Sequence, residues 1–262
     1  MDMELIYIYH SGFALLGDGF TVIMDYYRDS EDGQAQADLN RLMDGTFSQQ
    51  EAGMPEGIVH GELLRRPGKL YVLASHFHPD HFNKEVLQWR EQRPDIIYIF
   101  SKDILRHRRA QKEDAVWLKK GEEYKDETLS VRAFGSTDVG VSFLLQASGK
   151  KIFHAGDLNN WHWREESTEQ EVEEAEKAFL REVAVLAKDA DFLDLAMFPV
   201  DPRLGADYMS GAKQFIDRIP VRKFVPMHFW ERYAKANAFR EYAENHGTEF
   251  IVLTHPGMSV EF

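Results

Sequence analysis

Short runs of apolar residues, each bounded by turn residues, recur along most of the chain. Some runs, such as Ile96-Ile97-Tyr98-Ile99-Phe100, are apolar at every position, which is typical of a strand covered on both faces. The runs at 5–9 and 20–24 flank Gly17-Asp18-Gly19, and this pattern predicts a hairpin. In all, the runs predict strands at residues 5–9, 20–24, 71–74, 96–100, 129–134, 141–146, 151–154, 193–199, 223–226 and 250–253.

Helical periodicity appears between these strands. The clearest predicted helix spans 168–188, where Val172, Phe179 and Val183 recur at helical spacing, and Ser167 with Gln170 predicts a capping box at its start. Further helices are predicted at 83–92, 102–109, 211–218 and 234–245. Residues 29–66 are polar and rich in Asp, Gln and Gly, so we interpret them as an insertion or long loop with one short helix near 37–43. The pattern as a whole predicts one mixed α/β domain over residues 1–262.

The composition narrows the class of protein. Of the 262 residues, 44% are hydrophobic, which suits a globular core, and the net charge of −13 argues against nucleic acid or an anionic membrane as partner. Cysteine is absent, which excludes thiolate nucleophiles and cysteine-based metal sites. The first residues lack a basic segment and an apolar core, and no apolar run is long enough for a membrane span, so we expect a cytoplasmic protein. Edge strands and exposed aromatic residues permit a homo-oligomer.

The most informative segment is Ser75-His76-Phe77-His78-Pro79-Asp80-His81-Phe82, which follows a predicted strand. In extended backbone His76 and His78 point the same way, so both can bind one cation. Pro79 turns the chain and lets Asp80 and His81 face a second cation. A solvated turn or a helix cap needs only one of these residues, so the cluster favours a metal site.

One short loop cannot complete two coordination shells, so further ligands are expected from distant segments. Asp157 follows a predicted strand in His154-Ala155-Gly156-Asp157, where Gly156 allows a close approach of the backbone. Its carboxylate is well placed to bridge two metals. His228 ends another apolar strand. Each residue alone is typical of a turn or a core, but beside the histidine cluster both are predicted ligands.

The order of these motifs resembles the metallo-β-lactamase-fold hydrolase superfamily over nearly the whole chain. The motifs that carry the resemblance are, in chain order, Asp25, His76-x-His78-x-Asp80-His81, Gly156-Asp157 and His228. Among its branches the chain is similar to the UlaG-like metal-dependent hydrolases, including the ascorbate-6-phosphate lactonase type, through His10-Ser11-Gly12-Phe13, His154-Ala155-Gly156-Asp157 and Pro226-Met227-His228. The resemblance implies a four-layer αβ/βα sandwich, with two mixed β-sheets face to face and helices on the outer faces. It also implies one or two divalent metal ions at one edge, with zinc expected first and manganese or iron as alternatives.

One position departs from the superfamily pattern. The superfamily usually supplies a third histidine to the first metal from a Gly-His-Thr-like turn, whereas Ser136 stands at that position in Gly135-Ser136-Thr137-Asp138. Either Asp138 replaces the imidazole, which shifts the preference toward harder ions such as Mn²⁺ or Fe²⁺, or one site alone is filled. That site would comprise Asp80, His81, Asp157 and His228.

Two residues are expected beside the ligands. In the superfamily the residue at the position of Asp25 orients the histidine loop from behind, the alternative being a cap at the end of its strand. His10 is expected either near the floor of the site or in the core.

Other residues are candidates for contact with substrate. Trp161 and Trp163 either line a substrate pocket or anchor the outer helices, and His162 between them is a candidate donor to an oxyanion or leaving group. Arg203 is the candidate clamp for a substrate phosphate or carboxylate, the alternative being an ion pair with Asp201 or Asp207.

These observations predict a metal-dependent hydrolase that acts on a small-molecule substrate, an anionic ester, lactone or phosphodiester. Asp80, Asp157 and His162 are the predicted catalytic residues, with Asp157 holding the metals and accepting a proton from water. One alternative is a metal-binding or regulatory protein of the same fold that Ser136 has made catalytically impaired. A redox protein with a di-iron centre and a metal-independent structural homologue are the others.

Overall fold

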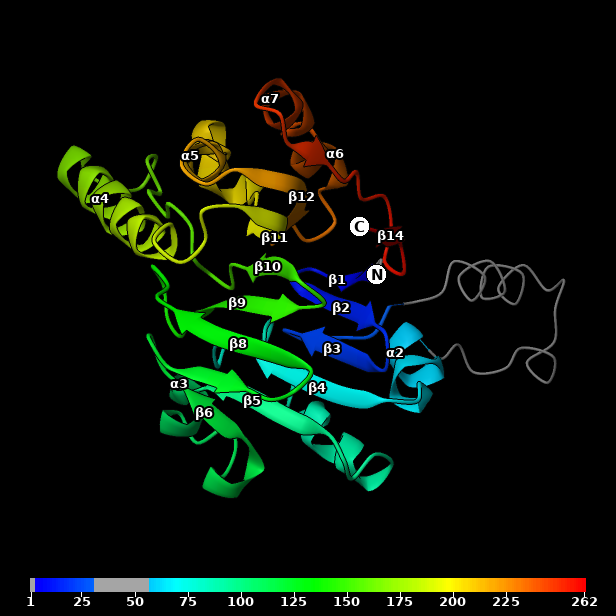
Figure 1. Cartoon of the computed structure of the whole chain (residues 1–262). Helices are drawn as coiled ribbons and strands as arrows, with labels where there is room; N and C mark the ends of the chain where they lie inside the picture. The colour runs from blue at the N-terminus through cyan, green and yellow to red at the C-terminus, as the bar shows by residue number, and fades with distance from the viewer. Residues whose placement is uncertain (1–2, 31–56) are drawn as a thin grey trace, which may run out of the picture.

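Apolar strands that are covered on both faces form two β-sheets packed against each other (Figure 1). The structure is a computed structural model that describes residues 3–30 and 57–262. The strands of the first sheet are β1 (Glu4–Tyr9), β2 (Gly12–Gly17), β3 (Phe20–Met24), β4 (Lys69–Ala74), β5 (Ile97–Ser101), β6 (Val116–Leu118) and β14 (Ser259–Glu261). Those of the second are β7 (Glu123–Lys125), β8 (Leu129–Phe134), β9 (Ser142–Ala147), β10 (Lys150–His154), β11 (Leu193–Pro199), β12 (Val221–Met227) and β13 (Glu249–Phe250).

Both sheets mix parallel and antiparallel neighbours. The strand order is β14-β1-β2-β3-β4-β5-β6 in the first sheet and β13-β12-β11-β10-β9-β8-β7 in the second. In the first, β1 and β2 are antiparallel while β3 and β4 are parallel. In the second, β9 and β10 are antiparallel while β10, β11 and β12 run parallel.

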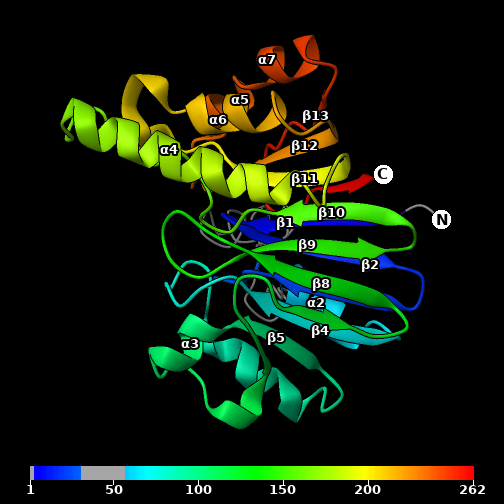
Figure 2. The ribbon, with the colours of Figure 1, turned by 60° about the vertical axis from the view of Figure 1, so that its left-hand side comes forward.

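Helices lie on the outer face of each sheet. The α-helices are α2 (Ile58–Gly61), α3 (Lys102–Arg106), α4 (Glu169–Leu186), α5 (Ser210–Ile216), α6 (Tyr233–Asn237) and α7 (Arg240–Asn245). The 3-10 helices are η1 (Leu63–Arg65), η2 (Lys84–Glu91), η3 (Lys112–Asp114) and η4 (Pro202–Asp207). Figure 2 shows α4 to α7 over the second sheet and α3 on the far side of the first. The predicted α/β sandwich with two mixed sheets and outer helices is therefore confirmed.

Alternation along the strands assigns side chains to separate layers of the core. In β1, Leu5 and Tyr7 belong to the buried cluster that also contains Phe143 of the facing sheet. Ile6, between them, belongs to a second cluster with Trp89 of η2. Because both faces of the strand are covered, the strand is apolar at nearly every position, as its sequence indicated.

The predicted N-terminal hairpin was wrong in its first strand. β2 lies between the runs at 5–9 and 20–24 and pairs with both β1 and β3. Gly17-Asp18-Gly19 therefore joins β2 to β3, and the two residues His10 and Ser11 join β1 to β2. The short strands β6, β7 and β14 were also missed, since three residues are too few for alternation to stand out. The strand predicted at 250–253 ends at Phe250.

Several helix predictions also need correction. The segment predicted at 83–92 forms the 3-10 helix η2, the helix predicted at 234–245 is divided into α6 and α7, and that predicted at 102–109 ends at Arg106. The capping box of α4 lies one residue later than predicted. Thr168 Oγ1 accepts from the Glu171 amide at 3.3 Å, and Glu171 Oε2 accepts from the Thr168 amide at 2.8 Å. The short helix predicted near 37–43 lies outside the described residues.

The parallel strands bring the residues of interest to one edge of the sandwich. The carboxyl ends of parallel neighbours point the same way, so β3 and β4 end together, as do β10, β11 and β12. Asp25 follows β3, His76 follows β4, Asp157 follows β10 and His228 follows β12. Within the described part of the chain, none of the helices combines the length and the apolar character needed to cross a lipid bilayer.

Candidate metal centre

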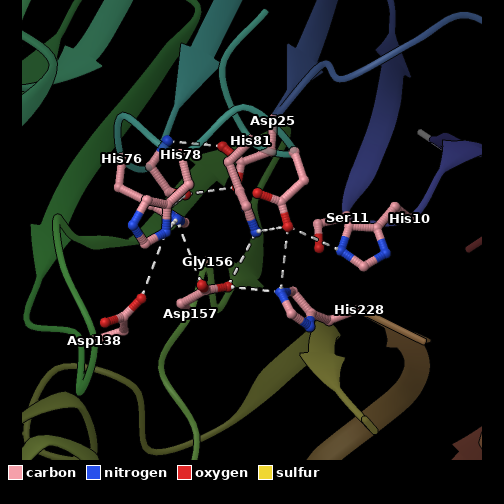
Figure 3. A network of polar contacts seen from close by, with 12 residues as sticks. His10, Ser11, Asp25, His76, His78, His81, Asp138, Gly156, Asp157 and His228 are labelled. Carbon is pink, nitrogen blue, oxygen red and sulfur yellow. Dashed lines mark hydrogen bonds and ion pairs between the residues drawn. The ribbon is translucent and has the colours of Figure 1, made fainter. Parts of the chain in front are cut away.

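Figure 3 shows histidine and aspartate side chains from several loops converging at this edge. They form two groups, and within each group all ligand-type atoms lie within 4.8 Å of one another. The first group consists of His76, His78, Asp138 and Asp157. The second group consists of His10, Asp80, His81 and His228.

The first group joins the histidine loop to the loops before β9 and after β10. His76 Nε2 lies 3.0 Å from His78 Nδ1 and 3.4 Å from Asp157 Oδ2. Asp138 Oδ2 lies 3.5 Å from His78 Nδ1. The Oγ of Ser136 accepts a hydrogen bond from the Asp138 amide at 3.3 Å. Asp138 therefore lies beside the imidazoles of His76 and His78. This is the position needed if its carboxylate replaces the histidine whose place Ser136 takes.

The second group surrounds one oxygen of Asp80. Asp80 Oδ2 lies 3.4 Å from His10 Nε2, 3.8 Å from His81 Nε2 and 3.9 Å from His228 Nε2. A turn closed by the His81 amide on the His78 carbonyl, at 3.0 Å, separates Asp80 and His81 from the first pair of imidazoles. His10, which the sequence placed at the floor of the site or in the core, lies among the ligand-type atoms.

Asp157 lies between the two groups and offers one oxygen to each (Figure 3). Its Oδ2 faces His76 of the first group, at 3.4 Å from Nε2. Its Oδ1 faces the second group, at 3.1 Å from His81 Nε2 and 3.3 Å from His228 Nε2. A carboxylate in this position could bind a cation in either group through one of its two oxygens.

The buried polar atoms of the centre fit divalent metal ions. His10 Nε2, His81 Nε2 and Asp157 Oδ1 are buried and have no hydrogen-bond partner among the described residues. Such an atom costs about 1–3 kcal/mol when it is left unsatisfied, a cost that a cation bound among these atoms would offset. Imidazole nitrogens and carboxylate oxygens are the ligands that zinc, manganese and iron accept in proteins.

The electrostatics of the centre also suit a metal. Burial lowers the pKa of His10 to about 4 and that of His76 to about 3, so both rings are neutral near pH 7. The Trp230 amide donates to His10 Nδ1 at 3.3 Å, so a cation at His10 Nε2 would have to displace the proton of this ring. Burial raises the pKa of Asp157, but His81 and the other nearby imidazoles outweigh it and hold this pKa well below its usual value. Burial and the Asp157 carboxylate raise the pKa of Asp138, a repulsion that a cation between the two carboxylates relieves.

Asp25 holds the histidine loop from behind the ligands. The Ser75 amide donates to Asp25 Oδ1 at 2.7 Å, and the Ser75 hydroxyl donates to Oδ2 at 2.6 Å. His81 Nδ1 lies 2.7 Å from the same Oδ2, so Nδ1 carries a proton, and Nε2 faces Asp157 at 3.1 Å. Burial lowers the pKa of His81, but the Asp157 and Asp25 carboxylates outweigh it and raise this pKa well above its usual value in the metal-free protein. This placement supports the orienting role that the superfamily resemblance implies for Asp25.

Two glycines let the loops of the centre approach one another. Gly156 has a φ of +52°, and a Cβ there would lie 2.8 Å from Ser75 Cβ and from the Val141 carbonyl oxygen. Gly140 has a φ of +74°, and a Cβ there would overlap the backbone of Ser75 and the side chain of His76. Any larger residue would therefore push the ligand loops apart.

Asp201 is a partner of His228 that the sequence did not reveal. Asp201 Oδ2 lies 3.0 Å from His228 Nδ1. The pairing of Pro199 in β11 with Met227 in β12 places the residues just beyond the two strands side by side. Sheet register would have found this contact, but register is not visible in one sequence. Arg203 donates to Asp201 through Nε and Nη2, so the ion pair that was left open as an alternative is present.

The two tryptophans lie against the centre, whereas His162 is engaged elsewhere. Trp161 Nε1 donates to the Asp157 carbonyl at 2.8 Å, and its ring stacks on Trp163 with centroids 6.1 Å apart. His162 Nδ1 accepts from the Arg164 amide at 3.2 Å, and its Nε2 lies 3.3 Å from the Asp207 carbonyl oxygen. Both nitrogens of His162 are therefore occupied by backbone groups, unlike those of the free donor that was expected.

Similar solved structures share this fold. Igni18, a metallo hydrolase from the archaeon Ignicoccus hospitalis, has a TM-score of 0.65 at 18% identity, with 100% of this chain and 99% of that chain covered. YhfI from Bacillus subtilis, a metallo-β-lactamase-fold protein, has a TM-score of 0.59 at 11% identity, with 100% and 99% covered. CmlA, a diiron β-hydroxylase from Streptomyces venezuelae, has a TM-score of 0.63 at 13% identity, and this chain covers 54% of it.

A family model matches most of the chain. The model described as the beta-lactamase superfamily domain matches residues 47–229, which is more than half of the chain. The match includes the histidine loop and Asp157, and it ends one residue after His228. The chain therefore belongs to the beta-lactamase superfamily.

Proposed function

We propose that this protein is a hydrolase that holds one divalent metal ion in each of the two groups and acts on a small anionic ester, lactone or phosphodiester. The observation that carries the proposal is the carboxylate of Asp157, whose Oδ2 faces His76 and whose Oδ1 faces His81 and His228. A carboxylate shared in this way is the natural bridge of a two-metal hydrolytic site. The proposal includes the narrower likeness to the UlaG-like hydrolases, which remains a prediction.

Two divalent ions supply Lewis acidity, which lowers the pKa of a water and stabilises negative charge on the reacting group. The chain supplies the holding groups and a weak proton acceptor. The side chain of Asp80 is 23% exposed, against 8% for Asp157, so Asp80 is the carboxylate that water and substrate reach more easily. Burial raises the pKa of Asp80, but the neighbouring imidazoles of His10, His81 and His228 outweigh it and hold this pKa below its usual value. Asp80 is thus ionised near neutral pH, the form that binds a cation, but with its pKa held this low it accepts a proton from water only weakly.

The two groups differ in the ions they favour. The second has three imidazoles beside the carboxylates of Asp80 and, through its Oδ1, Asp157, and this larger share of imidazole suits zinc. The first has two imidazoles and two carboxylates, because Asp138 stands where an imidazole is usual, and this set favours the harder ions manganese and iron. The diiron state of CmlA supports the inclusion of iron among the ions tested.

The surroundings of the centre support an anionic substrate. The side chain of Arg203 is 41% exposed, and its Nη2 lies 3.4 Å from His228 Nδ1, which places a positive charge beside the second group. The partly exposed rings of Trp161 and Trp163 lie nearby, with Trp161 5.4 Å from the His228 ring. A small anion with an apolar body matches these neighbours.

The test combines metal analysis with turnover. Protein purified without chelator, and protein reconstituted with Zn²⁺, Mn²⁺ or Fe²⁺, is analysed for metal content and assayed on a panel of phosphodiesters, lactones and esters. We expect about two ions per chain and turnover that Asp157→Asn abolishes. The matched control is His107→Ala, whose exposed ring stacks on Phe77 with centroids 3.7 Å apart but lies outside both groups. Absence of metal after reconstitution would overturn the proposal, and two metals without turnover on the whole panel would favour the regulatory alternative.

A further inference from the structure

Asp201, which is buried, and Arg203, which is partly exposed, form an ion pair directly behind His228. Asp201 is fully buried, and its Oδ2 lies 3.0 Å from His228 Nδ1. Arg203 donates to the same carboxylate through Nε, at 3.1 Å from Oδ1 and 2.9 Å from Oδ2, and through Nη2, at 2.6 Å from Oδ2. The carboxylate therefore has an arginine on one side and a candidate metal ligand on the other.

The fold builds this contact from two neighbouring strand ends. The Val200 amide donates to the Met227 carbonyl at 3.0 Å, which continues the β11–β12 ladder one step beyond β11. Asp201 then caps η4, accepting from the Arg203 amide at 2.9 Å. On the other strand, the His228 backbone has a φ of 62° and its amide donates to the His10 carbonyl at 3.2 Å. Both side chains are thus held by backbone hydrogen bonds on either side of the contact.

The shorter contact favours one tautomer of His228, because Asp201 Oδ2 lies 3.0 Å from Nδ1 whereas the competing donor, Arg203 Nη2, lies 3.4 Å from it. A carboxylate accepts only, so the nitrogen that lies 3.0 Å from Asp201 carries the ring proton. Nδ1 is then the protonated nitrogen, and Nε2 presents its lone pair toward Asp80 at 3.9 Å and Asp157 at 3.3 Å. Arg203 balances the buried negative charge and fixes the plane of the carboxylate through two donors.

We propose that Asp201 and Arg203 are positioning residues that hold His228 with its proton on Nδ1 and its Nε2 aimed into the second group. The consequence for metal affinity rests on the proposed function, whereas the tautomer of His228 does not. A carboxylate behind a metal-binding histidine commonly changes metal affinity 10–100-fold. Asp201 orients His228 directly. Arg203 acts through Asp201, so its ion pair also supports the metal centre.

Asp201→Asn is the diagnostic variant, because asparagine keeps the size and the helix-capping ability of aspartate. If the amide nitrogen takes the place of Oδ2, it donates to His228 Nδ1 and moves the ring proton to Nε2. If it takes the place of Oδ1, its hydrogens face the Arg203 amide and Nε, which are also donors. Both orientations lose a hydrogen bond that the carboxylate makes.

The experiment has two readouts on the full-length chain. In the metal-free protein with ¹⁵N-labelled histidine, the ring nitrogens of His228 are assigned by NMR. We expect the Nδ1–H form in the wild type and a shift toward the Nε2–H form in Asp201→Asn. Titration with Co²⁺ against a competing chelator measures affinity, where we expect a loss of about 10–100-fold for one ion. Arg203→Lys keeps the charge without the fork and is expected to lose several-fold.

The control is Asp207→Asn, which removes an exposed ion pair of the same segment, at 2.9 Å from Arg164, and is expected to change neither readout. Wild-type tautomer and affinity in Asp201→Asn would overturn the proposal. If that variant does not fold, the same result in Arg203→Lys would overturn it. A wild-type chain that binds no Co²⁺ would overturn the proposed function, while the NMR readout would still decide the tautomer.

Discussion

Gly156→Ala tests how closely the loops of the metal centre must pack. The substitution adds one methyl group between the loop that carries Asp157 and the loop that begins at Ser75. The added Cβ would lie 2.8 Å from Ser75 Cβ and from the Val141 carbonyl oxygen, closer than real Cβ contacts. It also places a residue with a side chain at a φ of +52°.

Two costs add at this position. The left-handed backbone costs a non-glycine residue about 1–2 kcal/mol. Forcing extra volume into a packed site costs about 1–3 kcal/mol more. We therefore expect the free energy of unfolding of the metal-free protein to fall by about 2–5 kcal/mol. Relief of the overlap moves Asp157 away from the histidine loop, so metal affinity should fall at least about tenfold, within the range seen when support for ligands is lost.

Gly149→Ala is the matched control. Its φ of +77° carries the same backbone cost, but a Cβ there meets no atom within 4 Å. Denaturant unfolding of both metal-free variants isolates the cost of the contact, and chelator competition measures metal affinity. We expect a loss of about 1–2 kcal/mol and unchanged affinity for Gly149→Ala. Equal destabilisation by the two variants, with wild-type affinity in both, would show that the loops do not need this close approach.

Three further outcomes are expected. Asp25→Asn should lower metal affinity about 10–100-fold, because an amide hydrogen facing His81 Nδ1 favours a proton on the nitrogen that faces the metal site. Calorimetric titration measures this affinity, and an unchanged value would contradict the prediction. Asp138→His should raise the preference for Zn²⁺ over Mn²⁺ in competition experiments, since it replaces a carboxylate by an imidazole, and an unchanged preference would exclude Asp138 as a ligand. Burial lowers the pKa of His10 to about 4 and of His76 to about 3, so below about pH 6.5 the unfolded chain binds protons that the folded chain does not. The free energy of unfolding of the metal-free protein should therefore decrease from pH 6.5 toward pH 4, and a flat profile in urea titrations would refute these shifts.

The fold class and half of the centre could be predicted from local patterns. Runs such as 96–100 are apolar on both faces because both faces of the sheet are covered. This property can be recognised from consecutive residues alone. His76 and His78 share a group, and Asp80 and His81 share the other, because two-residue spacing and a proline turn act over a few bonds. Asp157 and His228 were found because each ends a strand at the same edge.

What the sequence alone determined, then, was the local geometry: which runs form strands and which neighbouring residues face the same way. The tertiary structure decided which distant residues meet. His10 entered the second group because the β1–β2 turn passes beside the loop after β12, where its carbonyl accepts from the His228 amide. Asp201 reached His228 through the register of β11 and β12, and Asp138 reached His78 through a loop of the opposite sheet. These contacts join segments far apart along the chain, and their positions depend on sheet register and on the packing of the two sheets, which no local pattern encodes.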